Sequence, residues 1–207
     1  LEVGGREPFV FRRFYNAING REGVLGKDWN HNYEVHLEFT DGEAVLLRED
    51  GKEERFFWEK DRYLSLFASE GTLEKAEDGY TYRTREQKVY RFDREGMCLE
   101  TETLLGGRVT FTYETEAPFH LVKAEKDTGE FFAFSYGADG MLERVEDHVG
   151  RCLSYQYQGG LLKEVTLPDG NTFRYGYTPQ GKLEQVENPR GIVTVENFFD
   201  EEHRTTL

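Results

Sequence analysis

The sequence lacks several features that mark common classes of protein. Only two of its 207 residues are cysteine, Cys98 and Cys152, so a disulfide and two free thiols both stay open. It has no apolar run of about 18 residues and opens without the pattern of a secretory signal, so we expect no membrane insertion. With 26 basic against 40 acidic side chains its formal charge is −14, which argues against a nucleic-acid partner.

Motifs of catalysis and metal binding are equally scarce. The 5 histidines are scattered without the spacing of a zinc site. Neither the nucleophile elbow of hydrolases nor a Walker loop occurs. Paired acids such as Glu53 and Glu54 are unavoidable in so acidic a chain, and no loop has the ligand pattern of a calcium site. We therefore predict no catalytic residue, no metal and no cofactor, in a protein that is not an enzyme.

Glycine and aromatic residues, by contrast, are abundant and recur at regular intervals. Residues 129–186 show this best, because an opening glycine, an aromatic-x-aromatic pair, a turn glycine and a closing Leu-x-x-Val return about every 20 residues. Extended along the chain, the pattern predicts about five to six stacked units. The predicted structural repeat positions are Tyr90, Phe92, Phe111, Tyr113, Phe134, Tyr136, Tyr155, Tyr157, Tyr175, Tyr177, Gly140, Gly160 and Gly181.

Each unit has the length of two strands and two turns. The alternating rings predict a strand with one buried face. The Leu-x-x-Val spacing, as in Leu162 and Val165, does not have a period of two, so we predict a β-bulge or a strong twist there. A helix is the alternative, but the segment from Met141 to Asp147 is short for one. Because a lone hairpin is only marginally stable, the units must stack. We predict an all-β fold of antiparallel hairpin repeats that form a curved sheet, with the tyrosines packed between hairpins.

The N-terminal part differs from the repeats. We predict a β capping region at residues 1–78 and the hairpin array at residues 79–207. Apolar and polar residues alternate strictly over residues 29–39, which predicts one half-buried strand. On its apolar face, His31 is more simply explained as a buried histidine held by a hydrogen bond than as a functional group. The candidate binding residues, beside a glycine-rich loop at residues 16–28, are Trp29, His31, Asn32 and Tyr33.

These motifs resemble the YD repeat of Rhs proteins. That family includes teneurins, the C subunits of insecticidal toxin complexes and wall-associated bacterial proteins. Phe92 and Asp93 keep the aromatic-Asp pair of the repeat, whereas Gly137, Gln158 and Thr178 depart from its Asp. The opening stretch is similar to the entry region of bacterial Rhs chains. The residues that carry this second resemblance are Pro8, Phe9, Phe11, Arg13, Tyr15, Asn16, Gly23, Leu25, Gly26, Trp29, His31 and Tyr33.

The resemblance implies a β-strip wound into a hollow shell, often around a toxic C-terminal domain. We therefore expect a non-catalytic piece of an Rhs shell, within a larger secreted or cell-surface protein, that encloses or presents a toxin. Self-cleavage in the family depends on a motif beyond the array and is not carried over. The sequence ends at Leu207 without a cap, which favours a piece of a longer array.

The expected partners follow from the same resemblance. They are a toxin domain and an immunity or delivery protein, reached through the full-length chain. Self-association through the last edge strand is a further expectation. The alternative function is a carbohydrate- or protein-binding module that uses surface aromatics and the loop at residues 16–28.

Overall fold

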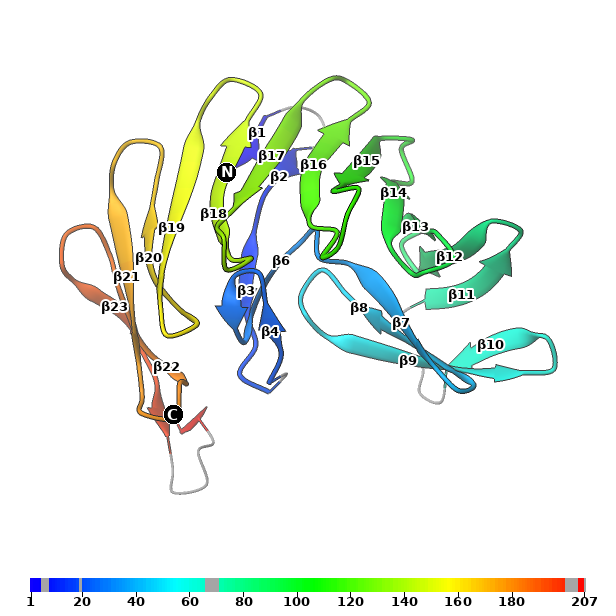
Figure 1. Ribbon diagram of the computed structural model, residues 1–207, viewed down its shortest axis with the longest axis horizontal. Coiled ribbons are helices and arrows are strands. Elements are labelled where there is room, and N and C mark those ends of the chain that lie inside the picture. Colours follow the sequence, from blue (N-terminus) through cyan, green and yellow to red (C-terminus); the bar gives the residue numbers. More distant parts are fainter. Residues whose placement is uncertain (5–7, 19, 66–70, 200–204, 207) are drawn as a thin grey trace. The chain divides into compact units, whose positions relative to one another are not determined.

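The computed structural model describes residues 1–4, 8–18, 20–65, 71–199 and 205–206, and their regular structure is entirely β-strand (Figure 1). The predicted all-β fold of antiparallel hairpins is confirmed. No helix long and apolar enough to cross a membrane occurs in the ranges given. Cys98 and Cys152 are both free thiols, which settles the question that the sequence left open.

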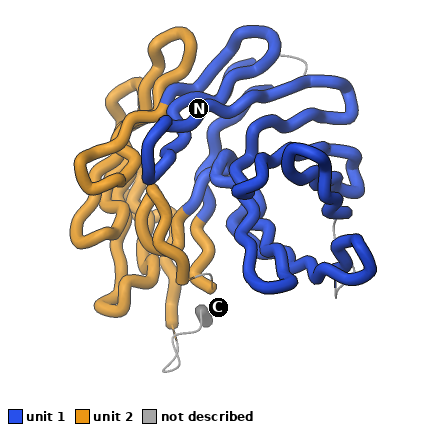
Figure 2. The backbone as a smooth tube through the Cα atoms, turned by 45° about the vertical axis from the view of Figure 1, so that its right-hand side comes forward, with its two compact units in different colours: residues 1–14, 30–133 blue, residues 15–29, 134–207 orange. Residues whose placement is uncertain are grey.

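The chain divides into two compact units, which Figure 2 colours separately. Unit 1 comprises residues 1–14 and 30–133, and unit 2 comprises residues 15–29 and 134–207. The N-terminal region therefore contributes to both units. The boundary near residue 78 describes a different division, between a capping region and an array, and it stays a prediction.

Unit 1 begins with short strands and a four-stranded meander. Its early strands are β1 (Glu2–Val3), β2 (Phe9–Val10), β7 (His36–Thr40), β8 (Glu43–Leu47), β9 (Glu53–Glu59) and β10 (Arg62–Ser65). Successive antiparallel hairpins join β7 to β10. The first two turn at the Asp-Gly pairs at 41–42 and 50–51, where glycine φ values of 80° and 75° suit the tight turn.

The prediction of one continuous strand over residues 29–39 is wrong. β6 (Trp29–His31) ends where a turn begins, and β7 starts only at His36. The Glu34 N–H donates to the His31 carbonyl at 3.0 Å, and Glu34 Oε2 accepts from the His31 N–H at 2.7 Å. These local bonds replace the ladder bonds of a strand. The predicted alternation of burial nevertheless holds for His31, Tyr33, Val35 and Leu37.

The repeats form a long run of hairpins in which each strand pairs with the next one in the chain. The strands of unit 1 are β11 (Gly71–Ala76), β12 (Gly79–Thr84), β13 (Val89–Phe92), β14 (Cys98–Glu102), β15 (Arg108–Tyr113), β16 (Leu121–Lys126) and the start of β17 (Phe131–Tyr136). Those of unit 2 are β18 (Leu142–Asp147), β19 (Cys152–Gln158), β20 (Leu161–Thr166), β21 (Thr172–Tyr177), β22 (Leu183–Glu187) and β23 (Val193–Glu196). The short strands outside these runs are β3 (Arg13–Tyr15), β4 (Glu22–Gly23), β5 (Gly26–Lys27), β24 (Phe198–Phe199) and β25 (Thr205–Thr206).

The bulge predicted for the Leu-x-x-Val segments is present. In the β19–β20 pair the register shifts between Gln156 and Tyr157, so Lys163 has no residue opposite. The extra residue turns both Leu162 and Val165 toward the core, where each is 0% exposed. The same shift recurs in the β21–β22 and β15–β16 pairs. A spacing that looked helical is therefore a strand with one residue inserted.

Most hairpin loops share one hydrogen-bonded form. A glycine N–H donates to the carbonyl three residues earlier, as from Gly181 to Thr178 at 2.9 Å. Where that earlier residue is Asp, Thr or Asn, its side chain also accepts a backbone N–H four residues later. Asp93 Oδ1 accepts from Met97 at 2.8 Å, and Thr178 Oγ1 accepts from Lys182 at 3.2 Å. Thr178 departs from the Asp of the YD pattern, yet its hydroxyl replaces the carboxylate in the same bond.

Asp147 makes the most completely bonded of these turns. Its side chain is 0% exposed, Oδ1 accepts from the N–H groups of Val149 and Arg151, and Oδ2 accepts from Arg151 Nε at 2.6 Å. Burial by itself would raise the pKa of this carboxyl, but the bonds from Arg151 and Val149 outweigh it and leave the pKa lowered.

We expect Asp147→Asn to lower the free energy of unfolding by about 1–3 kcal/mol, because an amide cannot accept all these bonds. A lowered folded pKa stabilises the protein above the ordinary carboxyl pKa, and that contribution disappears as pH falls through the folded value. The variant should therefore lose less stability on acidification from about pH 5 to pH 2 than the wild type. Urea unfolding at several pH values measures this. Parallel pH profiles would contradict it.

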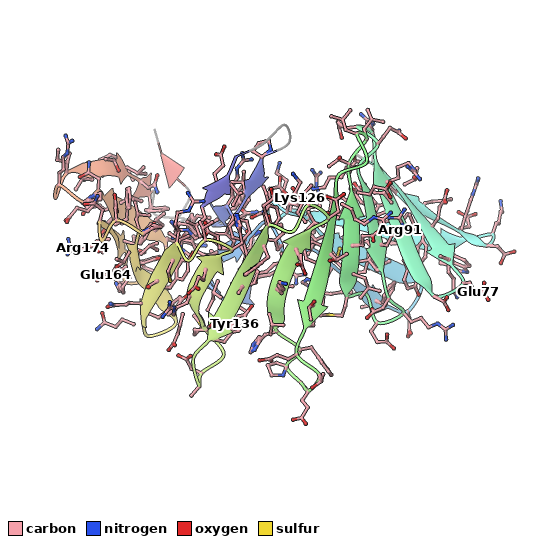
Figure 3. The ribbon with its side chains drawn as sticks, turned by 90° about the horizontal axis from the view of Figure 1, so that it is seen from above. Glu77, Arg91, Lys126, Tyr136, Glu164 and Arg174 are labelled. Carbon is pink, nitrogen blue, oxygen red and sulfur yellow. The ribbon has the colours of Figure 1, made fainter. Side chains whose placement is uncertain are left out.

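Charged side chains are paired across the strands. Arg174 on β21 donates from Nε to Glu164 on β20 at 3.0 Å, and Figure 3 labels these two residues. Arg174 also donates from Nη1 to Glu187 on β22 at 3.2 Å. In unit 1, Arg91 on β13 pairs with two carboxylates of one neighbouring strand, Glu100 and Glu102 on β14. Exposed pairs of this kind contribute at most about 1 kcal/mol each, so they favour the register more than they stabilise the fold.

Candidate functional site

The ring pairs of the repeats occupy two distinct environments. The first ring of most pairs lies in the core, and the second ring lies half-buried beside the preceding hairpin. The buried ring positions are Tyr90, Phe92, Phe134, Tyr155 and Tyr175. The half-buried ones are Phe111, Tyr113, Tyr136, Tyr157 and Tyr177. The three repeat glycines, Gly140, Gly160 and Gly181, all have positive φ, between 75° and 80°.

A tyrosine hydroxyl links consecutive hairpins. Tyr157 donates to the Leu142 carbonyl at 2.6 Å, and Tyr177 donates to the Leu162 carbonyl at 2.7 Å. In unit 1, Tyr113 donates to the Cys98 carbonyl at 2.8 Å. In each case the acceptor lies 15 residues earlier in the chain. We call this recurring bond the tyrosine link.

Replacing Tyr157 with phenylalanine should lower the free energy of unfolding by about 0.5–1.5 kcal/mol, the usual net value of one hydrogen bond. The ring and its packing are retained, so the difference reports the hydroxyl alone. Chemical denaturation of the two proteins measures it. An unchanged midpoint would show that water replaces the link at no cost.

The segment at residues 15–29, which we call the docking segment, is bound to the repeats of unit 2. Trp29 is buried, its Nε1 donates to the Tyr177 hydroxyl at 3.0 Å, and its ring meets Tyr175 edge-on at 5.3 Å. The Tyr15 hydroxyl accepts the Leu183 N–H at 2.8 Å. The aromatic residues of this segment therefore complete the side-chain packing of the repeats.

A buried ion pair reinforces the same contact. The Asp28 carboxylate is fully buried, and its Oδ2 lies 3.4 Å from Lys182 Nζ, which also donates to the Ala17 carbonyl. The Lys27 N–H donates to the Gly160 carbonyl at 3.3 Å. The loop at residues 16–28 thus contacts repeat turns within unit 2.

In unit 1 the aromatic residues of the N-terminal region pack on the β17 strand. Phe9 stacks on Phe132 with ring centroids 4.5 Å apart, and Tyr33 lies 6.2 Å from the same ring. His31 is 1% exposed, its Nδ1 accepts the Tyr33 N–H at 3.2 Å, and burial lowers its pKa to about 3. The imidazole is therefore neutral and serves as an acceptor within the core.

Two adjoining clefts open in unit 1, with volumes of about 220 and 240 Å³. Of the predicted binding residues, Asn32 and Tyr33 line the cleft of about 220 Å³. Trp29 and His31 are buried and line neither cleft. Asn32 fixes the nearby backbone, since Oδ1 accepts the Arg12 N–H at 2.7 Å and Nδ2 donates to the Val10 carbonyl at 2.9 Å.

Sequence reasoning did not bring together the charged residues of these clefts. Arg12, Glu49 and Lys88 line the first cleft, and Glu49 lines both. They come from three separate stretches of the chain, so no local spacing signals them. No group of three or more His, Cys, Asp or Glu side chains able to hold a metal occurs among the described residues.

Two family models match the chain. The model described as "RHS Repeat" matches residues 158–193, which include the tyrosine link at Tyr177 and the turn at Gly181. The model described as "Domain of unknown function (DUF6531)" matches residues 1–56, which include the docking segment. The chain therefore carries an RHS repeat, which confirms the resemblance that its motifs predicted.

The chain is also similar to two curated Rhs-type proteins. "Double-stranded DNA deaminase toxin A" of Burkholderia cenocepacia (strain H111) is 24% identical over 196 residues, which are 90% of this chain and 12% of that protein. "tRNA nuclease WapA" of Bacillus subtilis (strain 168) is 25% identical over 185 residues, which are 88% of this chain and 8% of that protein. The chain thus spans only a small part of each relative.

Solved structures show weaker likeness. A porin-like protein from Bacteroides uniformis has a TM-score of 0.44 at 12% identity. The match covers 83% of this chain and 91% of the porin-like chain. The TcdB2-TccC3-TEV structure has a TM-score of 0.31 at 12% identity, covering 94% of this chain and 15% of its own.

Proposed function

We propose that this Rhs chain is a non-catalytic scaffold, a segment of a β-shell that encloses or presents a toxin domain in a larger secreted or cell-surface protein. The observation that carries the proposal is the use of the N-terminal region. Its aromatic residues Phe9, Trp29 and Tyr33 are buried against the repeats of their own unit. Residues that resemble the Rhs entry motif thus serve packing, as expected of a region that caps an array.

The relatives support the toxin-associated part of the proposal. The name of one contains "deaminase toxin" and that of the other "tRNA nuclease", and this chain matches only 12% and 8% of their lengths. Their named activities are therefore compatible with catalysis in other parts of those proteins. In this chain the corresponding role is that of the non-catalytic part.

The last repeat strand supports the view that the sheet accepts a further partner. All four residues of β23 are exposed, and Val193 and Val195 are 45% and 43% exposed. Such an edge can pair with another hairpin or with a second copy of the chain. Size-exclusion chromatography across protein concentrations tests self-association, and a monomer at every concentration would exclude it.

Limited proteolysis of the full-length protein tests the scaffold proposal. If the shell encloses a cargo domain, that domain should resist protease in the wild type and become sensitive in Trp29→Ala. This substitution removes the ring that packs on Tyr175 and bonds the Tyr177 hydroxyl. Leu104→Ala serves as the control, because Leu104 is 71% exposed on a turn. Equal cleavage of the cargo domain in the wild type and in Trp29→Ala would contradict enclosure.

The binding-module alternative is tested on the isolated chain. A glycan array and a pull-down would detect a carbohydrate or protein partner that uses the surface aromatics or the loop at residues 16–28. Several groups of that loop are already bonded to the repeats of unit 2, at Lys182 and Gly160. We therefore expect no ligand that requires this loop to be free.

A further inference from the structure

The clefts of unit 1 point to a function beyond that of a scaffold. We propose that the cleft lined by Arg12, Glu49 and Lys88 binds a carboxylate-bearing peptide segment, with an acidic side chain seated against Arg12. Every residue of this cleft belongs to unit 1. Binding to the cleft can therefore be measured whether or not the chain forms part of a shell.

Arg12 supplies the main recognition element. Its side chain is exposed and lines the cleft, and its guanidinium makes no hydrogen bond or ion pair with any residue that the structure describes. Its backbone, in contrast, is fixed at both ends of the peptide unit, because Asn32 Oδ1 accepts its N–H and the Asn32 N–H donates to its carbonyl at 3.1 Å. A guanidinium on a fixed backbone presents several donors in a plane, which matches the two oxygens of a carboxylate.

The Glu49 cluster gives the cleft its charge. Glu49 Oε1 accepts from the Tyr90 hydroxyl at 2.7 Å and also from Lys88 Nζ, which lies 4.8 Å from the centroid of the Tyr90 ring. Glu49 Oε2 has no partner among the described residues. Two cations and one carboxylate therefore line this cleft, a net positive charge in a chain whose formal charge is −14. The local field favours an anion.

The walls complete a site for more than a bare ion. The aromatic residues that line the cleft are Phe9, Phe14, Tyr33, Tyr90 and Phe111. Thr101, which is 7% exposed, also lines it. The neighbouring cleft shares Phe14, Val35, Glu49 and Tyr90, so the two volumes of about 220 and 240 Å³ adjoin. Apolar walls with a few polar groups are typical of ligand sites.

The pattern of donors and acceptors favours a peptide over a neutral sugar. Arg12, Lys88 and Thr101 offer donors, while Glu49 Oε2 is the carboxylate oxygen left to accept a ligand N–H. An acidic side chain uses the cations, and the amide N–H of its backbone suits Glu49. A neutral saccharide would leave the Arg12 charge without a counter-charge.

Titration of the 207-residue chain with three probes tests the proposal. The probes are the peptide acetyl-Gly-Glu-Gly-amide, its Gln counterpart, and glucuronate, with binding followed by backbone amide NMR shifts. We expect saturable shifts around Arg12, Tyr33 and Lys88 with the Glu peptide. The Gln peptide should bind about tenfold more weakly or worse, because it lacks the charge.

Variants of Arg12 separate recognition from folding. Arg12→Ala should weaken binding of the Glu peptide by about tenfold or more, and Arg12→Lys should weaken it less, since the charge remains without the planar donors. Arg62→Ala is the matched control, because Arg62 is another exposed arginine of unit 1, outside the cleft, and it should leave binding unchanged. Equal melting temperatures of the variants would confirm that each one folds.

Three results would overturn the proposal. They are the absence of saturable shifts with the Glu peptide, equal affinity of Arg12→Ala and the wild type, and tighter binding of glucuronate than of the Glu peptide. The third result would reassign the cleft to an acidic sugar.

Discussion

Replacing Phe132 with alanine is expected to lower the free energy of unfolding by about 3–5 kcal/mol, the usual cost of removing a buried phenylalanine. Phe132 is 0% exposed and lies at the centre of the contact between the N-terminal region and β17 in unit 1. Its ring stacks on Phe9 at 4.5 Å, meets Phe11 edge-on at 6.3 Å and lies 6.2 Å from Tyr33. One substitution therefore removes three aromatic contacts and leaves a cavity.

The neighbouring residue provides the control. Phe131 precedes Phe132 on the same strand and is only half-buried, so its side chain points to the other face. Phe131→Ala should cost clearly less than Phe132→Ala in urea or thermal unfolding. Equal losses for the two variants would show that the Phe9 stack does not anchor the N-terminal region.

Replacing Gly26 with alanine should have the second-largest effect, a loss of about 2 kcal/mol or more. Gly26 has a φ of 92°, which a residue with a Cβ adopts only with strain. A Cβ built there would also lie 2.6 Å from the Gly160 carbonyl oxygen, a backbone atom that a rotamer change cannot move. The docking segment would have to shift away from the repeats of unit 2.

Gly20 separates strain from contact. It has a φ of 60°, and a Cβ there would meet nothing within 4 Å. Gly20→Ala therefore carries the conformational cost alone, and the difference between the two variants measures the close approach to Gly160. Unfolding can be followed by tryptophan fluorescence, which reports the surroundings of Trp29 as well as the global transition. Equal destabilisation by both variants would contradict a tight contact at Gly26.

Much of the fold could be predicted because its signals are local. The ring pairs, the turn glycines and the Leu-x-x-Val spacing each depend on residues within one hairpin, and the bulge inferred from Leu162 and Val165 is present. The error at residues 29–39 has the same origin. Alternation predicted burial correctly from His31 to Leu37, although Asn30 is buried and Phe39 is exposed. It could not reveal that Glu34 bonds the His31 backbone and closes a turn.

The candidate sites were harder to predict because they combine distant residues. Trp29 and Asn32 are three positions apart, yet Trp29 packs on Tyr175 in unit 2 while Asn32 lines a cleft in unit 1. Their proximity in the sequence did not indicate that the two side chains have different tertiary surroundings. Arg12, Glu49 and Lys88 carried no motif at all.

The sequence by itself therefore determined the all-β class, the hairpin repeat and the resemblance to Rhs repeats, because period, turn chemistry and bulges are properties of short stretches. The tertiary structure alone decided how the N-terminal region is used. It brings residues 15–29 to the repeats of unit 2 and residues 9–11 to Phe132 in unit 1. Contacts between residues more than 100 positions apart depend on the register and twist of every hairpin between them, which no local pattern encodes.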